Sequence, residues 1–163
     1  MITEKRKNQW PYKALFFDND CILVNTEHLF FQANKDAMAD YGVKLTKDQF
    51  IEVSLRQGKH CFSLITHPNF DQDAYEKLQQ KRNQIYEHLL RTQLSVIPGV
   101  ESVLTSLSAN FSLGVVTTSL RKNFEIIHAQ TGFLKYFDFI IAREDVDRCK
   151  PDPEPYRLAC EKA

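Results

Sequence analysis

The sequence predicts an α/β protein, in which helices cover both faces of a parallel sheet. After Pro98-Gly99, short apolar runs typical of buried strands alternate with helical patterns. A further apolar run lies near the N-terminus, and the stretch between the two regions has a helical pattern without a convincing strand. Such alternation favours parallel pairing, because each connecting helix returns across a face of the sheet.

The first predicted strand is Ala14–Phe17, and two carboxylates one residue apart, Asp18 and Asp20, follow it directly. In an extended chain, residues i and i+2 point to the same side, so both carboxylates would occupy one small volume. Two like charges that close are costly unless a cation or an electrophilic centre lies between them. The alternative is a pair of solvated acids in a turn.

The stretch from residue 26 to residue 93 is predicted to form a small helical bundle inserted after the first strand. Thr26, Thr46 and Asp71 are each expected to cap the start of a helix, and Gln49 completes a capping box with Thr46. The third helix carries an apolar stripe made of Tyr75, Leu78, Ile85, Leu89 and Leu90.

The region after Pro98-Gly99 supplies the remaining strands. The predicted elements are a helix over 100–107, a strand over 111–116, a helix over 120–130 that Gly132 ends, and a strand over 137–142. A last helix is expected to begin with Asp152 as its N-cap and Pro153 at its first position.

The predicted strands end in residues that can handle phosphate. Thr117-Thr118-Ser119 follows the second strand, and Lys150 lies in the loop after the third. Ligands of such sheets bind at the carboxyl ends of the strands, where Asp18 and Asp20 also lie. One carboxylate can act as a nucleophile, while hydroxyl and amide groups bind phosphoryl oxygens and a lysine neutralises charge. Alternatively, Thr117 is a helix cap and Lys150 a surface cation.

Composition limits the classes of partner. Lys and Arg total 21, as do Asp and Glu, so no net charge favours nucleic acid or an anionic membrane. No apolar segment approaches the length of a membrane helix, and the N-terminus has no hydrophobic signal segment.

The four cysteines lack metal-type spacing, so we expect reduced thiols in a cytoplasmic protein. The basic cluster Lys5–Lys7 is expected to be a solvated tail.

The motifs resemble those of the haloacid dehalogenase superfamily, in its phosphatase branch. Residues 16–27 resemble the first motif, 114–119 the second and 149–153 the third. By this pattern, phosphoglycolate phosphatases and β-phosphoglucomutases are the most similar subgroups. The resemblance implies a Rossmannoid core of residues 1–25 and 94–163, with residues 26–93 as an inserted helical cap.

The resemblance also implies a role for each motif residue. Asp18 would attack phosphorus to form an aspartyl-phosphate, and Asp20 would act as general acid and then as general base. Thr117 would hold the phosphoryl group together with the amide that follows it, and Lys150 would hold Asp18 and phosphate in register. Thr118 and Ser119 belong to the same phosphate-binding segment. Mg²⁺ would be bound by the Asp18 carboxylate and the Asp20 carbonyl.

Substrate choice is expected to depend on the cap. Arg56 and Lys59 flank Gly58 in a basic loop and are candidates to contact a substrate anion; the alternative is a solvated loop. The substrate would be a small phosphorylated metabolite.

Four histidines have no ligand spacing and are expected at the surface or at the edge of the core: His28, His67, His88 and His128.

The sequence departs from the family pattern in two places. Cys21 stands where the first motif usually has glycine, so a positive φ at this position would add strain.

The family's fourth motif, an acidic pair that completes the metal site, has no counterpart before Ala163. We therefore expect a fragment or a truncated product of a phosphatase gene, with an incomplete magnesium site. If the chain is the whole protein, its activity should be weak or absent. The first strand would keep an open edge that could pair with another chain.

Three functions remain open from the sequence. The first is a Mg²⁺-dependent phosphatase for a small metabolite, and the second is a phosphosugar mutase on the same scaffold. The third is a non-catalytic remnant or a receiver-like phosphoacceptor, since receivers also combine acids, threonine and lysine at strand ends. The helical insertion of roughly 70 residues argues against a receiver, as do two acids on the first strand.

Overall fold

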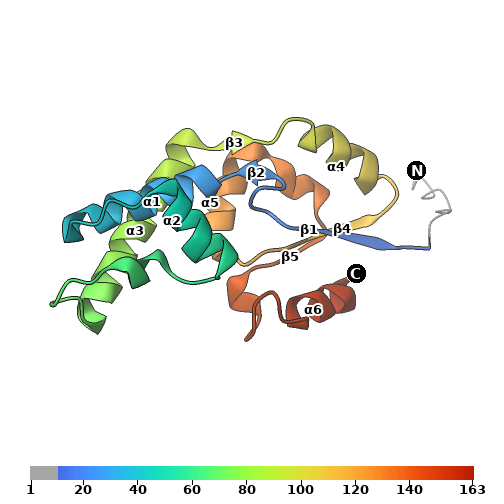
Figure 1. Ribbon diagram of the computed structural model, residues 1–163. Coiled ribbons are helices and arrows are strands. Elements are labelled where there is room, and N and C mark those ends of the chain that lie inside the picture. The colour runs from blue at the N-terminus through green and yellow to red at the C-terminus, as the bar shows by residue number, and fades with distance from the viewer. Residues whose placement is uncertain (1–10) are drawn as a thin grey trace. The chain divides into compact units, whose positions relative to one another are not determined.

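The computed structural model describes residues 11–163, and the chain divides into two compact units (Figure 1). The core unit comprises the chain up to Asn25 together with Ser95–Ala163, and the helical unit comprises Thr26–Leu94. The second segment of the core unit begins at Ser95, one residue later than the expected start at residue 94. The basic tail Lys5–Lys7 lies outside the described residues.

The core unit contains a parallel sheet of three strands in the order β1-β4-β5. They are β1 (Ala14–Phe17), β4 (Ser112–Val116) and β5 (Phe139–Ile141). The predicted α/β class and parallel pairing are confirmed. Strand β5 starts later than expected, because the Asp138 carboxylate accepts hydrogen bonds from Ser112 Oγ and the Leu113 N–H. Within the described residues, β1 pairs on one side only, with β4.

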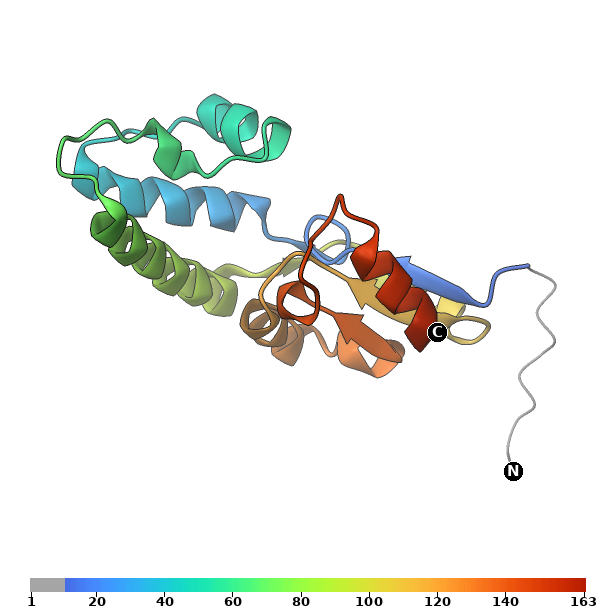
Figure 2. The ribbon, with the colours of Figure 1, turned by 90° about the horizontal axis from the view of Figure 1, so that it is seen from below.

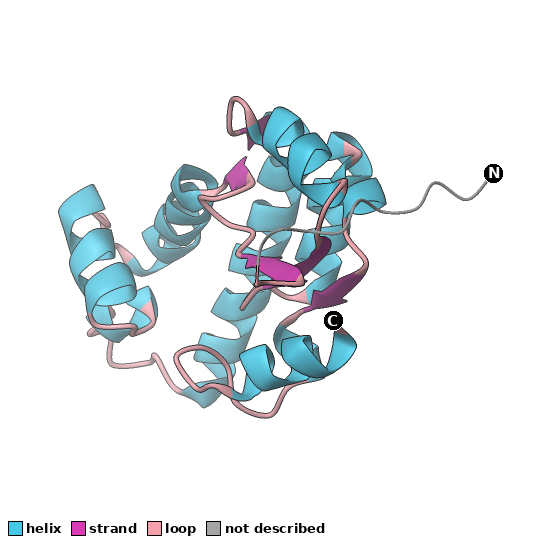
Figure 3. Ribbon diagram, turned by 90° about the vertical axis from the view of Figure 1, so that its right-hand side faces the viewer, coloured by secondary structure: helices cyan, strands magenta, loops and turns pink. Residues whose placement is uncertain are grey.

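Helices cover both faces of this sheet (Figures 2 and 3). On one face, α4 (Val100–Ser108) and α5 (Arg121–Thr131) bury Leu104 and Phe124 against Leu113 and Val115 of β4. On the other, α6 (Glu154–Lys162) buries Ala159 in a cluster with Val116. Alternate residues of β4 therefore supply the two halves of the core.

The helix α6 begins one residue later than predicted. Pro153, not Asp152, occupies its N-cap position, so the expected capping role of Asp152 is corrected. The Asp152 carboxylate still accepts a hydrogen bond from the N–H of Glu154 at 2.9 Å, from one position earlier in the chain. A proline cannot donate a backbone hydrogen bond, so it fits this terminal position.

Two short strands that the sequence did not predict lie where the chain leaves and re-enters the core unit. They are β2 (Val24–Asn25) and β3 (Ser95–Val96), which pair antiparallel. Strands of two residues are too short to show an alternating pattern, so no periodicity marks them.

The helical unit contains two long helices, α1 (Glu27–Met38) and α3 (Gln72–Gln93), which pack against each other. Between them lie η1 (Ala39–Tyr41), α2 (Lys47–Phe50), the π-helical segment η2 (Ile51–Arg56) and η3 (Cys61–Leu64). The capping box of Thr46 and Gln49 is confirmed, and so is the cap of Asp71. Thr26 occupies the N-cap position of α1, but its side chain makes no capping bond.

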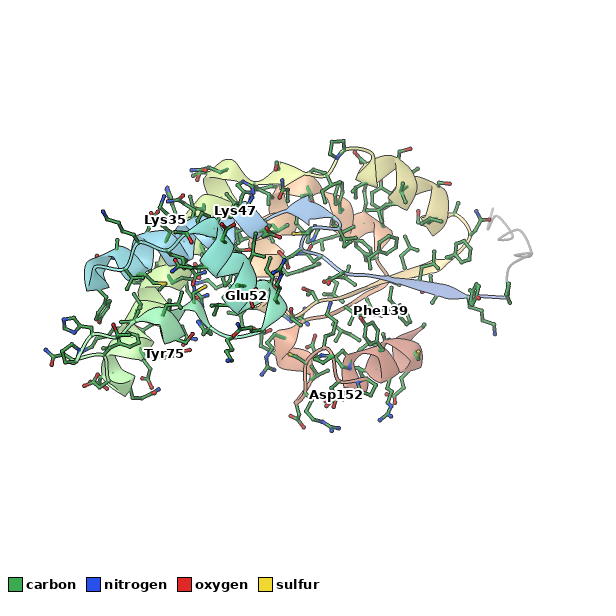
Figure 4. All side chains as sticks on the ribbon, viewed as in Figure 1. Lys35, Lys47, Glu52, Tyr75, Phe139 and Asp152 are labelled. Carbon is green, nitrogen blue, oxygen red and sulfur yellow. The ribbon has the colours of Figure 1, made fainter. Side chains whose placement is uncertain are left out.

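The predicted apolar stripe of α3 faces the core of the helical unit. Leu78, Leu89 and Leu90 are buried, while Tyr75 and Ile85 pack at the edge of the cluster (Figure 4 labels Tyr75). The same helix buries Arg82, whose guanidinium lies 4.8 Å from the centre of the Phe30 ring. A cation over an aromatic face compensates part of the cost of its burial.

All four cysteines are free thiols in the structure. Across residues 11–163, no helix combines the length and apolarity that crossing a membrane requires.

Gly114 occupies a position in β4 that leaves no room for a side chain. It is paired with Phe16 of β1 and Phe139 of β5, and the two aromatic rings contact edge to face at 5.7 Å. A Cβ atom on Gly114 would lie 2.3 Å from the Phe139 ring (Figure 4 labels Phe139). Glycine is therefore required at this position of the central strand, where the Phe139 ring occupies the space that a side chain would need.

We predict that Gly114→Ala lowers the free energy of unfolding by about 1–3 kcal/mol, because the added methyl displaces the packed Phe139 ring. Chemical denaturation measures the change. The double variant with Phe139→Leu, which shortens the obstructing side chain, should lose less than the sum of the two single variants. Additive losses would contradict this account of the glycine.

Candidate active site

The contact between Lys150 and Asp18 joins the segments that follow the two outer strands of the sheet. Asp18 follows β1, and Lys150 lies beyond β5, on the far side of β4. Lys150 Nζ lies 2.7 Å from Asp18 Oδ2 and donates a second hydrogen bond to the Val116 carbonyl at 3.2 Å. The lysine side chain is largely buried, with 17% of its surface exposed, while the Asp18 side chain is 44% exposed. The structure therefore places a cation beside a reachable carboxylate.

The loop after β1 is organised around Asn19, which is fully buried. Its carbonyl oxygen accepts hydrogen bonds from the N–H groups of Ile22, Leu23 and Val24, at 3.3, 2.9 and 3.4 Å. Its own N–H donates to Asp18 Oδ1 at 2.8 Å. Both carboxylate oxygens of Asp18 therefore have partners, and one orientation of the carboxylate is favoured.

Asp20 and the segment after β4 meet at the same edge of the sheet. The Ser119 hydroxyl donates to Asp20 Oδ2 at 2.5 Å, and the Ser119 N–H donates to Thr117 Oγ1 at 3.0 Å. Thr117 is buried, whereas Thr118 is exposed. The structure thus brings together, in the core unit, the expected motif residues Asp18, Asp20, Thr117, Thr118, Ser119 and Lys150.

Cys21 adopts the left-handed backbone conformation, which is strained for a residue with a side chain. Its φ is +61°, and it is the only non-glycine residue with positive φ in the part of the chain that the structure describes. Its N–H donates to the Val24 carbonyl at 2.8 Å, which closes the turn after Asp20. A side chain at such a φ costs roughly 1–2 kcal/mol compared with glycine.

His128 is neither at the surface nor at the edge of the core, and that expectation was wrong. Only 2% of the residue is exposed, and its Nε2 lies 2.8 Å from Asn19 Oδ1. Burial lowers the pKa of His128 to about 4, although the negative charge of Asp20 acts in the opposite direction. The imidazole is therefore neutral at pH 7.

A sequence signal for His128 exists on α5. His128 follows Phe124 by four residues, so both lie on one helical face, and their rings are 4.3 Å apart. A polar Asn19 in a buried stretch between two acids also needs a buried partner. Nothing local to either residue identifies the other, since 109 positions separate them.

The two basic residues proposed to bind substrate lie in the helical unit. Arg56, at the end of η2, pairs with Glu52 at 3.1 Å and is well exposed. Lys59 is also exposed. They are not among the residues that the core unit brings together, and their role in substrate binding stays a prediction.

The oxygen atoms of this site suit magnesium. Asp18 supplies a carboxylate and Asp20 a backbone carbonyl oxygen; Mg²⁺ prefers oxygen ligands and usually keeps several waters. No group of three or more His, Cys, Asp or Glu side chains that could hold a metal occurs in residues 11–163. The donor set fits an ion bound by one or two carboxylates.

Comparison with protein families gives one match. The model of the haloacid dehalogenase-like hydrolase family matches residues 15–163, which include both acids, Thr117 and Lys150. No curated protein matches the sequence.

Solved structures share the fold at low sequence identity. A candidate β-phosphoglucomutase from Thermotoga maritima has 28% identity and a TM-score of 0.69, over 92% of this chain and 70% of that chain. The protein CbbY from Rhodobacter sphaeroides, in complex with phosphate, has 25% identity and a TM-score of 0.73, over 93% and 72%. A candidate phosphoglycolate phosphatase from Lactobacillus plantarum has 24% identity and a TM-score of 0.76, over 93% and 71%.

We predict that Cys21→Gly raises the free energy of unfolding by about 0.5–1 kcal/mol, because relief of the positive-φ strain exceeds the entropy that glycine adds to the unfolded chain. Cys160→Gly is the matched control, since this exposed cysteine lies in α6 and glycine there should destabilise by about 1 kcal/mol. Denaturant titration compares the two. Equal losses in both variants would contradict the strain at Cys21.

Burial of neutral His128 predicts a loss of stability in acid. Its pKa is about 4 when folded and near 6.5 in a solvated chain, so only the unfolded chain takes up this proton between those values. The stability that the neutral His128 contributes is fully present above pH 6.5. The free energy of unfolding falls by about 3 kcal/mol on this account as the pH drops to 4.

The variant His128→Phe tests this by removing the titrating group. The free energy of unfolding is measured for both proteins at pH values from 7 to 4. The value for wild type minus the value for His128→Phe should fall as the pH falls, because only the wild type carries the titrating imidazole. A difference that stays constant over this range would contradict the assignment of a buried neutral imidazole.

Proposed function

The chain belongs to the haloacid dehalogenase-like hydrolase family, and on that basis we propose that it hydrolyses a small phosphorylated metabolite through an aspartyl-phosphate at Asp18. The observation that carries this proposal is the 2.7 Å contact between Lys150 Nζ and Asp18 Oδ2 at the ends of the parallel strands. The lysine orients a partly exposed carboxylate that can act as a nucleophile.

In the first half of the reaction, a carboxylate oxygen of Asp18 forms a bond to phosphorus while the bond from phosphorus to the ester oxygen breaks. Asp20, in its protonated form, gives its proton to the departing oxygen, so the product leaves as a neutral alcohol. The N–H of Asn19, 2.8 Å from Asp18 Oδ1, and Lys150 hold the nucleophile in one orientation.

In the second half, water attacks the phosphorus of the aspartyl-phosphate. Asp20, now a carboxylate, accepts a proton from this water, and the bond between phosphorus and the Asp18 oxygen breaks. Inorganic phosphate leaves and Asp18 is restored. The 2.5 Å hydrogen bond from Ser119 supports Asp20 in this role, because it fixes the carboxylate that has to face the leaving group and then the water.

The segment after β4 is proposed to bind the phosphoryl group. The hydroxyl of Thr117 and the N–H that follows it can donate to phosphoryl oxygens, with Thr118 and Ser119 completing the turn. Positioned donors and charge neutralisation supply most of the rate in phosphoryl transfer.

Mg²⁺ is the proposed cofactor, since members of this superfamily generally use it. The Asp18 carboxylate and the backbone carbonyl of Asp20 would hold it. When bound, the ion neutralises the negative charge of the phosphoryl oxygens. Lys150 alone cannot balance the charges of Asp18 and a phosphate group, so the charges at this site favour an additional cation.

A phosphosugar mutase is the second candidate, since a candidate β-phosphoglucomutase is among the similar structures at 28% identity. The two functions differ in whether water or a sugar hydroxyl receives the phosphoryl group. Release of free phosphate favours the phosphatase, and isomerised sugar phosphate favours the mutase. Arg56 and Lys59 remain the proposed contacts for an anionic group of the substrate.

We predict that the purified chain hydrolyses p-nitrophenyl phosphate in the presence of Mg²⁺ and that EDTA abolishes the activity. Asp18→Asn should lower kcat by at least about 10³-fold, because the carboxamide cannot act as the nucleophile. Asp20→Asn should lower it by about 10²–10⁴-fold through loss of the general acid and base. A colorimetric assay of p-nitrophenol measures both.

The matched control is Asp147→Asn, the same change at an exposed position of the core unit, and it should keep the activity. Thermal unfolding checks that each variant is folded. No Mg²⁺-dependent turnover by the folded wild-type chain would overturn the proposed function.

A further inference from the structure

A line of hydrogen-bonded polar side chains joins helix α5 to the residue between the two acids, and its two central members, His128 and Asn19, are buried. Thr131 Oγ1 lies 2.9 Å from His128 Nδ1, and His128 Nε2 lies 2.8 Å from Asn19 Oδ1. The Asn19 carboxamide nitrogen in turn lies 3.3 Å from Asp20 Oδ2. Asn19 is 0% exposed and His128 2%, so water does not compete for the bond between these two side chains.

The carboxylate at one end sets the direction of every hydrogen bond in this line. An ionised Asp20 only accepts hydrogen bonds, so the NH₂ of Asn19 faces it and the Asn19 oxygen faces His128. That oxygen needs a donor, so His128 carries its proton on Nε2 and accepts at Nδ1 from the Thr131 hydroxyl. Thr131 Oγ1 is left to accept from the Phe133 N–H, at 3.2 Å.

The neutral state of His128 makes this arrangement specific. Burial lowers the pKa of this imidazole to about 4, so at neutral pH it has one donor and one acceptor nitrogen. Without the Nε2–H donor, the Asn19 carboxamide could turn over and present its oxygen to the Asp20 carboxylate. Two acceptor oxygens facing each other repel, so Asp20 would be pushed from its position beside Ser119.

We propose that His128 is a positioning residue for the general acid and base: by holding the Asn19 carboxamide, it keeps the Asp20 carboxylate in its reactive orientation. This inference rests on the proposed role of Asp20. His128 does not touch the substrate, and its effect is transmitted through Asn19.

A purely structural role for His128 is the alternative, in which the imidazole only fills space beside Phe124 and Phe133. The two roles differ in their dependence on the leaving group. Phenol has a pKa near that of tyrosine, about 10, and departs poorly without a proton, whereas p-nitrophenol is a stronger acid that needs less help. A displaced Asp20 should therefore slow phenyl phosphate hydrolysis most.

The experiment compares kcat on phenyl phosphate and on p-nitrophenyl phosphate in three proteins. In His128→Phe, the phenyl ring keeps the packing but cannot donate, and we expect kcat on phenyl phosphate to fall about 10-fold more than kcat on p-nitrophenyl phosphate. The KM values should change little. In His128→Gln, the side-chain amide can still donate to Asn19, and the ratio of the two kcat values should return to within about 3-fold of wild type.

Ile127→Val is the control for lost packing on the same helix. Ile127 is fully buried in the core unit, so this variant should lower the melting temperature and leave the ratio of kcat values unchanged. An equal fall on both substrates in His128→Phe, with no rescue by glutamine, would overturn the positioning role.

A second readout does not depend on activity. Crystal structures of wild type, His128→Gln and His128→Phe should show the contact between Asp20 and Ser119, 2.5 Å in this structure, kept in the first two and lost in the third. If the wild-type chain hydrolyses neither substrate, the proposed function fails, and these structures alone decide the inference. An unmoved Asp20 in all three would overturn it.

Discussion

The parallel alignment of β1, β4 and β5 is the constraint on which the candidate site depends. It brings the carboxyl ends of three strands to one edge, so that Lys150 reaches across β4 to Asp18 at 2.7 Å. The close approach of the strands depends in turn on Gly114, since a side chain there would overlap the Phe139 ring. A packing requirement in the middle of the sheet therefore supports charge placement at its end.

The two acids of the first motif are held from different directions. Lys150 and the Asn19 N–H hold Asp18, whereas the Ser119 hydroxyl and the Asn19 carboxamide hold Asp20. Asn19 therefore contacts both carboxylates while its own side chain is anchored in the core. This arrangement explains how two like charges stay close together: each one has its own donors, and a buried residue separates them.

Local signals in the sequence predicted most of the fold. The bounds of β1 and the capping box of Thr46 followed from short patterns, and the edge position of the motif residues followed from parallel topology. The pairing of β2 with β3 did not, because strands of two residues have no periodicity. The partner of His128 did not either, since a contact across 109 positions leaves no local trace. Asp152 was misplaced by one residue at a helix end, where several polar arrangements satisfy the same N–H groups.

The central claim is that Asp18 carries the phosphoryl group. The chain is incubated with substrate and Mg²⁺ and then treated with borohydride. Borohydride reduces an acyl-phosphate to an alcohol, so it converts a phosphorylated aspartate to homoserine. We expect mass spectrometry to find homoserine at position 18, only when substrate is present and not in Asp18→Asn. Substrate turnover without modification at position 18, or with modification at another carboxylate, would contradict the account.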